Sequence, residues 1–208
     1  LGIIRGRAEY IALMQSEDAS LQKSVQVILG QADRMSKLIR SLLNLSRGEH
    51  KAPAGEVLLD EIIAEVSDVI AGELKKADVE LVVKIPAATA IKVRAEAGPL
   101  HQVFLNLLVN ALQAIEAKGG HQKKIFITAE RAGTSWRIAI ADTGIGIPQK
   151  DLKKLFQPFF TTKAVGVGTG LGLATCYRII ESWKGNIQVE SREGEGTTFY
   201  FTLPSRGN

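Results

Sequence analysis

The stretch Asp142-Thr143-Gly144-Ile145-Gly146-Ile147-Pro148, here called the aspartate loop, follows directly on the apolar residues 138–141. Those residues read Ile-Ala-Ile-Ala, which is typical of a buried strand, so Asp142 stands at a strand end. A carboxylate there can accept a hydrogen bond from an amino group, such as the exocyclic amine of adenine. The glycines allow the backbone to approach a flat ring closely. The alternative is a tight turn after a strand.

A second glycine-rich stretch precedes a helix that we predict over residues 171–183. This glycine-rich run reads Gly166-Val167-Gly168-Thr169-Gly170-Leu171-Gly172-Leu173. Backbone N–H groups in the first turn of a helix have no partner inside the helix and can bind an anion. The run lacks both the Rossmann spacing and the Gly-Lys-Ser/Thr ending of a Walker A loop. It predicts a phosphate-binding element, and the alternative is a flexible loop.

Asn106 and Asn110 lie four residues apart on a strongly apolar helix that we predict over residues 99–117. That spacing places both amides on one helix face. A carboxamide oxygen suits Mg²⁺, which prefers oxygen ligands and leaves other positions to water and substrate phosphates. The alternative is a pair of satisfied amides in the core, because burying an amide without partners is costly.

Residues 155–163, here called the phenylalanine segment, hold three phenylalanines and end in a lysine. They read Leu155-Phe156-Gln157-Pro158-Phe159-Phe160-Thr161-Thr162-Lys163. The rings could anchor a mobile lid by packing, with Lys163 facing a phosphate. A satellite hydrophobic cluster is the alternative interpretation.

The first fifty residues follow a helical pattern. Apolar residues recur at steps of four and three over about three heptads, namely Leu21, Val25, Ile28, Ala32, Met35, Ile39 and Leu42. A shorter stripe comprises Leu1, Ile4, Ala8 and Ile11. We predict a helical hairpin over residues 1–47, and a homodimer in which two hairpins form a four-helix bundle. The alternative is a hairpin packed on its own globular domain.

The remaining chain alternates strands and helices. Residues 48–55 contain two glycines and a proline and predict a linker to a domain over residues 56–208. In that domain we expect a helix over residues 60–77 with Asp60 as its cap. Strands are expected over residues 57–59, 79–85, 124–131, 136–141, 187–191 and 198–203. Strands paired as hairpins with interleaved helices predict an α+β, two-layer sandwich.

Composition limits the function classes. The net charge of +4 is spread along the 208 residues, whereas nucleic-acid binders usually show a basic stripe, so we expect no nucleic-acid partner. No apolar run of about eighteen residues exists, so we expect no membrane contact in this part of the protein. The single cysteine, Cys176, excludes an internal disulfide and is expected to be a small buried group.

In this order and spacing, the four motifs resemble the N, G1, F and G2 boxes of the histidine-kinase ATPase domain. That domain has the GHKL (Bergerat-type) ATP-binding fold, shared with DNA gyrase, heat-shock ATPase chaperones and mismatch-repair ATPases. The resemblance covers residues from about 56 to 204, and Gly196-Thr197-Thr198-Phe199 matches the closing strand motif. The sequences Phe-Phe-Thr-Thr-Lys (residues 159–163) and Gly-Thr-Gly-Leu-Gly-Leu (residues 168–173) resemble those of the subgroup that includes nitrogen-regulation sensor kinases.

The resemblance implies a role for each matched residue. Asn110 would ligate Mg²⁺, Asp142 would bind the adenine amine, and Lys163 would join Asn106 in catalysis. The other ATP-binding positions would be Gly144, Gly146, Ile147, Gly168, Thr169, Gly170, Leu171, Gly172 and Thr197. Asn106 stands where hydrolytic relatives carry a glutamate that serves as general base. Since an amide cannot take a proton, Asn106 favours phosphoryl transfer over hydrolysis.

The resemblance therefore implies an ATP-dependent protein histidine kinase of a two-component system, located in the cytoplasm. It would transfer the γ-phosphoryl group of ATP to a histidine on the dimerisation helix, and then to an aspartate of a response-regulator receiver domain. Leu1-Gly2-Ile3-Ile4 with Gly6 resembles the sequence just after the family's His-Glu-x-x-Asn-Pro motif, so the acceptor histidine is expected six residues before Leu1. His50, His101 and His121 lack the family's acidic neighbour. This fragment is accordingly expected to bind ATP without labelling itself, and a membrane anchor or sensor could lie upstream.

Two other functions stay open at this point. A kinase of the same fold could act on serine, like the anti-sigma-factor or mitochondrial dehydrogenase kinases. The heptad hairpin followed by a short linker favours the histidine class. The chain could also be a dimerising scaffold whose nucleotide pocket serves regulation, although the intact boxes argue against it.

Overall fold

A computed structural model of the chain describes residues 2–14, 19–46, 55–86, 90–163 and 168–205. The predicted linker lies outside the described residues except for Gly55, as do His50 and the first two residues of the glycine-rich run. The chain divides into two compact units, Leu1–Gly48 and Glu49–Asn208. Within the described ranges, no helix combines the length and the apolar character needed to cross a bilayer.

The first unit consists of two helices, α1 (Gly2–Met14) and α2 (Ala19–Ser46). Ala8 of α1 is buried, as are Val25 and Ala32 of α2, and the Gln22 side chain donates a hydrogen bond of 2.9 Å to the Ala12 carbonyl. Leu21 and Leu29 are half-buried. Eight further apolar residues on these helices are exposed: Ile3, Ile4, Tyr10, Ile11, Leu13, Val27, Ile28 and Met35. The side chains of residues 39 and 42, which end the predicted seam, lie outside the described part. The dimeric bundle stays a prediction.

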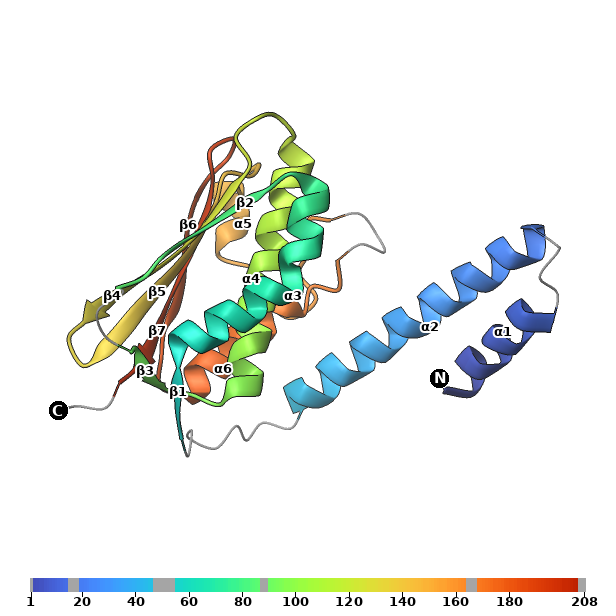
Figure 1. The fold of residues 1–208 in the computed structure, drawn as a ribbon, viewed down its shortest axis with the longest axis horizontal. Helices are drawn as coiled ribbons and strands as arrows, with labels where there is room; N and C mark the ends of the chain where they lie inside the picture. The colour runs from blue at the N-terminus through green and yellow to red at the C-terminus, as the bar shows by residue number, and fades with distance from the viewer. Residues whose placement is uncertain (1, 15–18, 47–54, 87–89, 164–167, 206–208) are drawn as a thin grey trace. The chain divides into compact units, whose positions relative to one another are not determined.

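The second unit contains a five-stranded mixed sheet with three long helices on one face (Figure 1). The strand order is β2 (Glu80–Lys84), β4 (Lys124–Ala132), β5 (Ser135–Asp142), β7 (Gly196–Pro204) and β6 (Ile187–Arg192). The helices are α3 (Leu59–Ala77), α4 (Ala97–Lys118) and α6 (Gly172–Ser182). A short helix, α5 (Gln149–Leu152), and a two-stranded sheet of β1 (Glu56–Leu58) and β3 (Lys92–Arg94) complete the unit. The predicted α+β architecture is confirmed.

The core lies between this sheet and the helices. Phe104 of α4 meets Phe201 of β7 edge to face, with ring centroids 5.6 Å apart, and both side chains are fully buried. In β5, alternate residues are buried: Trp136, Ile138, Ile140 and finally Asp142. Because side chains alternate across a strand, the pattern that buries the apolar residues also directs Asp142 toward the helices.

One local expectation was wrong. Asp60 does not cap α3, which begins at Leu59 after Leu58, with no side-chain cap. The Leu59 N–H instead donates to the Ile91 carbonyl at 2.9 Å, so tertiary contact replaces the cap. The pairing of β2 with β4, which is parallel, was not predicted. The short elements β3 and α5 were not predicted either, because neither is long enough to show a periodicity in the sequence.

Candidate functional site

One face of α4 contacts three segments that are far apart in the sequence. Asn106, Asn110 and Ala114, here called the α4 stripe, follow one another at four-residue spacing and so share a helix face. Their hydrogen bonds run from Asn106 Nδ2 to Gly172 O at 3.3 Å, from Lys163 Nζ to Asn110 Oδ1 at 2.9 Å, and from Ile145 N to Ala114 O at 3.1 Å. The stripe thereby joins the glycine-rich run, the phenylalanine segment and the aspartate loop.

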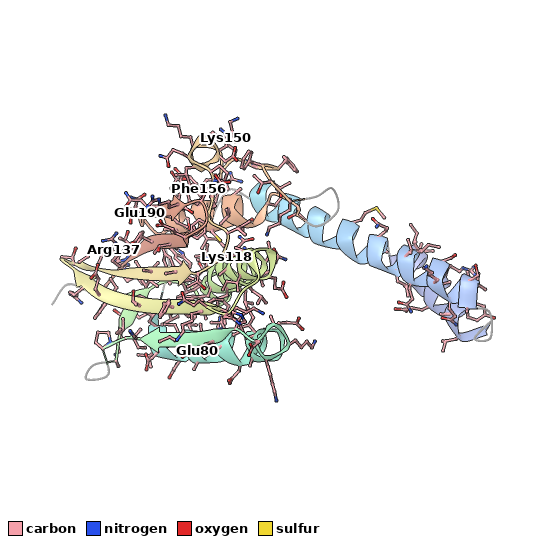
Figure 2. The ribbon with its side chains drawn as sticks, turned by 90° about the horizontal axis from the view of Figure 1, so that it is seen from above. Glu80, Lys118, Arg137, Lys150, Phe156 and Glu190 are labelled. Atoms are coloured by element: carbon pink, nitrogen blue, oxygen red, sulfur yellow. The ribbon has the colours of Figure 1, made fainter. Side chains whose placement is uncertain are left out.

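Asp142 supplies a buried carboxylate at the end of β5, where it is 9% exposed. Its Oδ1 accepts a hydrogen bond of 2.8 Å from the Gly144 N–H. Burial raises the pKa of Asp142 to about 6, although hydrogen bonds from the backbone of Gly144 and Thr197 and the charge of Lys118 oppose this. Lys118 extends from the helical side of the unit (Figure 2). A buried acceptor of this kind selects for a ligand that brings a hydrogen-bond donor.

Gly144 and Gly146 make close backbone contacts that no other residue could make. A Cβ atom on Gly144 would lie 2.6 Å from Ala114. Gly146 has φ +70°, and a Cβ there would lie 2.1 Å from the Arg192 carbonyl oxygen. The aspartate loop is therefore held against α4 on one side and against the turn between β6 and β7 on the other.

Ser191, which sequence reasoning missed, links this loop to β7. Its Oγ accepts a hydrogen bond from Ile147 N at 2.8 Å, donates one to Gly196 O at 2.8 Å, and lies 2.9 Å from Thr197 Oγ1. Since the Ser191 proton goes to Gly196, the Thr197 hydroxyl donates to Ser191 and keeps its own lone pairs for a ligand. Thr197 is buried and pairs directly with Asp142 across the two strands.

A hollow of about 390 Å³ opens at this end of the sheet. Its lining includes Asp142, Ser191 and Thr197 together with neighbouring residues of β6 and β7. The lining contains no residue of α4, the phenylalanine segment or the glycine-rich run, so this open hollow covers only the Asp142 end of the candidate site.

A backbone hydrogen bond joins the phenylalanine segment to the glycine-rich run. Phe159 N donates to Gly170 O at 2.9 Å, and a Cβ on Gly170, where φ is +66°, would lie 2.4 Å from the Phe159 carbonyl carbon. Phe156 (labelled in Figure 2) packs on the core, with its ring centroid 6.5 Å from that of Phe199. Phe159 is 59% exposed, so this ring does not anchor the segment by packing.

Lys163 is a half-buried cation whose partners are neutral. Its ammonium donates to Asn110 Oδ1 at 2.9 Å and also contacts Gln113 Oε1. Within the described ranges it has no carboxylate partner, and burial lowers the pKa of Lys163. Because both contacts are uncharged oxygens, no negative charge neutralises the ammonium, and it can bind an anionic ligand. Gln113 was not predicted, although its position one turn after Asn110 is a signal that could have been used.

The N-terminus of α6 offers a second anion-binding feature. Its N-cap, Leu171, makes no side-chain cap hydrogen bond, so N–H groups of the first turn are available to a ligand. Gly168 and Thr169 come just before it, and a Cβ on Gly168 would lie 2.4 Å from Thr161 Oγ1. The glycine-rich run therefore packs directly against the phenylalanine segment.

The donor set fits a magnesium–nucleotide complex. A nucleotide supplies an amino group for Asp142 and phosphates for Lys163 and the α6 N-terminus. Across the described ranges, no cluster of three or more His, Cys, Asp or Glu residues could hold a metal ion alone. An ion at Asn110 Oδ1 would therefore take its other ligands from phosphate and water, as Mg²⁺ commonly does.

The structure describes two of the histidines, His101 and His121, and the cysteine. His101 Nδ1 lies 2.7 Å from Ala97 O, and Nε2 contacts Glu65, so the ring bridges α3 and α4. His121 is exposed. Cys176 is fully buried, and burial raises the pKa of its thiol to about 12, so it packs as a small apolar group, as predicted.

Residues 95–207 match the family described as histidine kinase-, DNA gyrase B-, and HSP90-like ATPase. The chain belongs to this family, and its second unit carries the ATPase domain found in sensor histidine kinases.

Three relatives refine this placement. The chain is 35% identical over 205 residues to the sensor histidine kinase ZraS of Escherichia coli K12, a match that covers 98% of this chain and 42% of ZraS. The catalytic domain of histidine kinase ThkA superposes with a TM-score of 0.63 at 36% identity, covering 73% of this chain and 95% of that domain. ThkA in complex with the response regulator protein TrrA gives a TM-score of 0.69 at 29% identity, covering 98% and 57%. The chain thus spans less than half the length of ZraS.

Proposed function

We propose that the chain is the ATP-binding and phosphoryl-transferring part of a protein histidine kinase from a two-component system. The observation that carries this proposal is the α4 stripe, which draws a buried acceptor, an unneutralised ammonium and a helix N-terminus around one helix face. The buried acceptor suits the amine of ATP, and the ammonium and the helix N-terminus suit its negatively charged phosphates. The names of ZraS and ThkA favour histidine over serine as the acceptor.

Adenine would bind at the end of β5. The Asp142 carboxylate would accept a hydrogen bond from the exocyclic amine, and the Thr197 hydroxyl, whose proton is engaged with Ser191, would offer a second acceptor. Gly144, Gly146 and Ile147 would place their backbone against the ring, because the loop's contacts with α4 and the β6–β7 turn fix its path.

The phosphates would lie between Lys163 and the start of α6. Lys163 would donate to the terminal phosphate, while the backbone of residues 168–172 would surround the others. Mg²⁺, bound through Asn110 Oδ1, would bridge phosphate oxygens and neutralise their charge. These assignments agree with the chemistry of the side chains present: an amide oxygen, an ammonium and free N–H groups.

Asn106 would disfavour hydrolysis. Its Nδ2 donates to the Gly172 carbonyl at 3.3 Å, which fixes the orientation of the carboxamide beside the glycine-rich run. An amide cannot remove a proton from water, so ATP held here would lack a general base at this position. The γ-phosphoryl group would instead await an acceptor that brings its own nucleophile.

The acceptor histidine and the dimer interface would belong to the helical unit. The exposed apolar residues of α1 and α2 are the kind of surface that a second copy would cover in a four-helix bundle. We place the domain boundaries at 1–47, 48–55 and 56–208, the protein in the cytoplasm, and the kinase in the nitrogen-regulation-like subgroup. The ThkA–TrrA complex supports a response-regulator receiver domain as the partner.

The test is the chemistry of the phosphorylated product. The full-length parent protein, incubated with γ-labelled ATP and Mg²⁺, is expected to carry label that acid removes and alkali leaves in place, as for phosphohistidine. Label that survives acid but is lost in alkali would indicate phosphoserine and contradict the proposal. The 208-residue chain alone is expected to bind ATP and take up no label.

A further inference from the structure

The Lys163 ammonium rests on two amide oxygens that lie one turn apart on α4. One belongs to Asn110 and the other to Gln113, and all three side chains are half-buried. Asn110 has a role in the proposed function as a metal ligand, whereas Gln113 belongs to none of the four motifs. Its carboxamide oxygen nevertheless forms, together with that of Asn110, a binding site for a cation. In the ligand-free chain the Lys163 ammonium occupies this site.

We infer that Gln113 is a positioning residue that holds Lys163 on α4 until a magnesium–nucleotide complex arrives. The inference rests on the proposed function and concerns the regulation of the same site. Nucleotide loading exchanges the cations: the metal takes Asn110 Oδ1, and the ammonium leaves both amides for the phosphates. Gln113 sets the free-energy cost of that release.

Electrostatics requires the exchange. An ammonium 2.9 Å from Asn110 Oδ1 occupies the oxygen that a metal ion would need, and two cations on one carboxamide oxygen repel each other. Because an amide is neutral, it holds the ammonium less strongly than a phosphate does. The ammonium therefore favours the amides when phosphate is absent and the phosphates when they are present.

Movement of Lys163 extends to the glycine-rich run. A Cβ on Gly168 would lie 3.3 Å from the Lys163 Cβ, so the run packs against the stem of the lysine. A backbone hydrogen bond between Phe159 N and Gly170 O also joins the phenylalanine segment to this run. A lysine that shifts from Gln113 to phosphate thus changes its packing against Gly168.

A double-mutant cycle on the whole chain tests this inference. The variants are Gln113→Leu, Gln113→Glu and Lys163→Met, plus each Gln113 change combined with Lys163→Met. Affinity for Mg·AMPPNP is measured by calorimetry, and adenosine, which lacks phosphate, is titrated by NMR as the matched probe of the adenine end. Gln113→Glu is nearly isosteric, so it keeps the test decisive where the leucine variant folds poorly.

Gln113→Leu is expected to tighten Mg·AMPPNP binding about three- to tenfold, because release of the ammonium becomes easier. Gln113→Glu is expected to weaken it by a similar factor, because a carboxylate holds the ammonium more firmly. Both effects should vanish in the Lys163→Met background, and adenosine binding should stay unchanged.

Equal effects of the Gln113 changes with and without Lys163 would reduce Gln113 to a packing role and overturn the inference. Weaker Mg·AMPPNP binding by Gln113→Leu that depends on Lys163 would also overturn it, because Gln113 would then hold the ammonium on the phosphates. A wild-type chain that binds neither Mg·AMPPNP nor adenosine would overturn the proposed function itself, which is a separate result.

Discussion

Asn110 Oδ1 and Lys163 Nζ are joined by a hydrogen bond of 2.9 Å across 53 residues of sequence. The bond ties the end of the phenylalanine segment to the middle of α4. Contacts from the same helix face one turn before and one turn after reach the glycine-rich run and the aspartate loop. A single helix therefore sets the spacing between the ends of the candidate nucleotide site.

Asp142 gives the site a defined pH dependence. Burial raises its pKa from 3.8 to about 6, so the folded chain takes up a proton more readily than the unfolded chain. Between these two pH values the native state binds more protons, and the stability contributed by Asp142 therefore rises as the pH falls. Relative to Asp142→Asn, the wild-type free energy of unfolding should increase by on the order of 2 kcal/mol from pH 7 to pH 4.5.

Binding should respond in the opposite direction. An ionised carboxylate is the better acceptor for an adenine amine, so adenosine affinity should fall below pH 6 by up to about tenfold per unit. Urea unfolding and NMR titration of adenosine measure the two quantities. Asp68→Asn, a change at an exposed position of α3, serves as the control and should leave both pH profiles in place. Adenosine affinity that is flat from pH 7 to pH 5 would contradict the role of Asp142.

Gly146→Ala should disrupt the aspartate loop. The new Cβ would stand 2.1 Å from the Arg192 carbonyl oxygen at a residue with φ +70°. Gly133 provides a matched control, because it has φ +58° in the turn between β4 and β5 and open space around a Cβ. Gly133→Ala should cost about 1 kcal/mol of unfolding free energy, from backbone strain alone.

Gly146→Ala should cost about 2 kcal/mol more than the control, because the clash adds to the strain. It should also abolish Mg·AMPPNP binding, while Gly133→Ala leaves that binding intact. Chemical denaturation and calorimetry measure these effects. Equal losses of stability in the two variants would show that the contact with Arg192 does not constrain the loop.

Ser191→Ala should loosen the connection between the aspartate loop and β7. The change removes the acceptor for the Ile147 N–H and the partner of Thr197 Oγ1. The expected loss is about 1 to 2 kcal/mol of unfolding free energy, with weaker adenosine binding. Ser182→Ala removes one hydrogen bond, from Ser182 Oγ to the Ile179 carbonyl at the end of α6, and should leave adenosine binding unaltered. Equal adenosine affinity in the two variants would contradict the role of Ser191 in connecting the aspartate loop to β7.

Much of the candidate site was predictable because its residues follow simple periodicities. Alternation along β5 predicts that Asp142 faces the helices, and four-residue spacing predicts that Asn106 and Asn110 share a face. Both patterns depend only on local geometry. The glycine-rich run is likewise interpretable from a glycine stretch that meets a helix start.

Residues that act through tertiary contacts were harder to predict. Gln113 and Ser191 are polar residues outside any motif, and their importance comes from what the fold brings to them. The parallel pairing of β2 with β4 escaped prediction because strand periodicity does not identify the partner strand. Asp60 resembled a helix cap, but the Leu59 N–H donates a hydrogen bond to the Ile91 carbonyl, which makes a side-chain cap unnecessary.

The most direct test of a single nucleotide site built along α4 is calorimetric titration of the chain with Mg·AMPPNP. The wild-type chain should bind one equivalent. Asp142→Asn should weaken binding by about 10- to 100-fold, since a charged hydrogen-bond acceptor is lost. Asn110→Ala should remove the dependence of affinity on Mg²⁺. Unchanged affinity in Asp142→Asn, together with unchanged magnesium dependence in Asn110→Ala, would contradict the account.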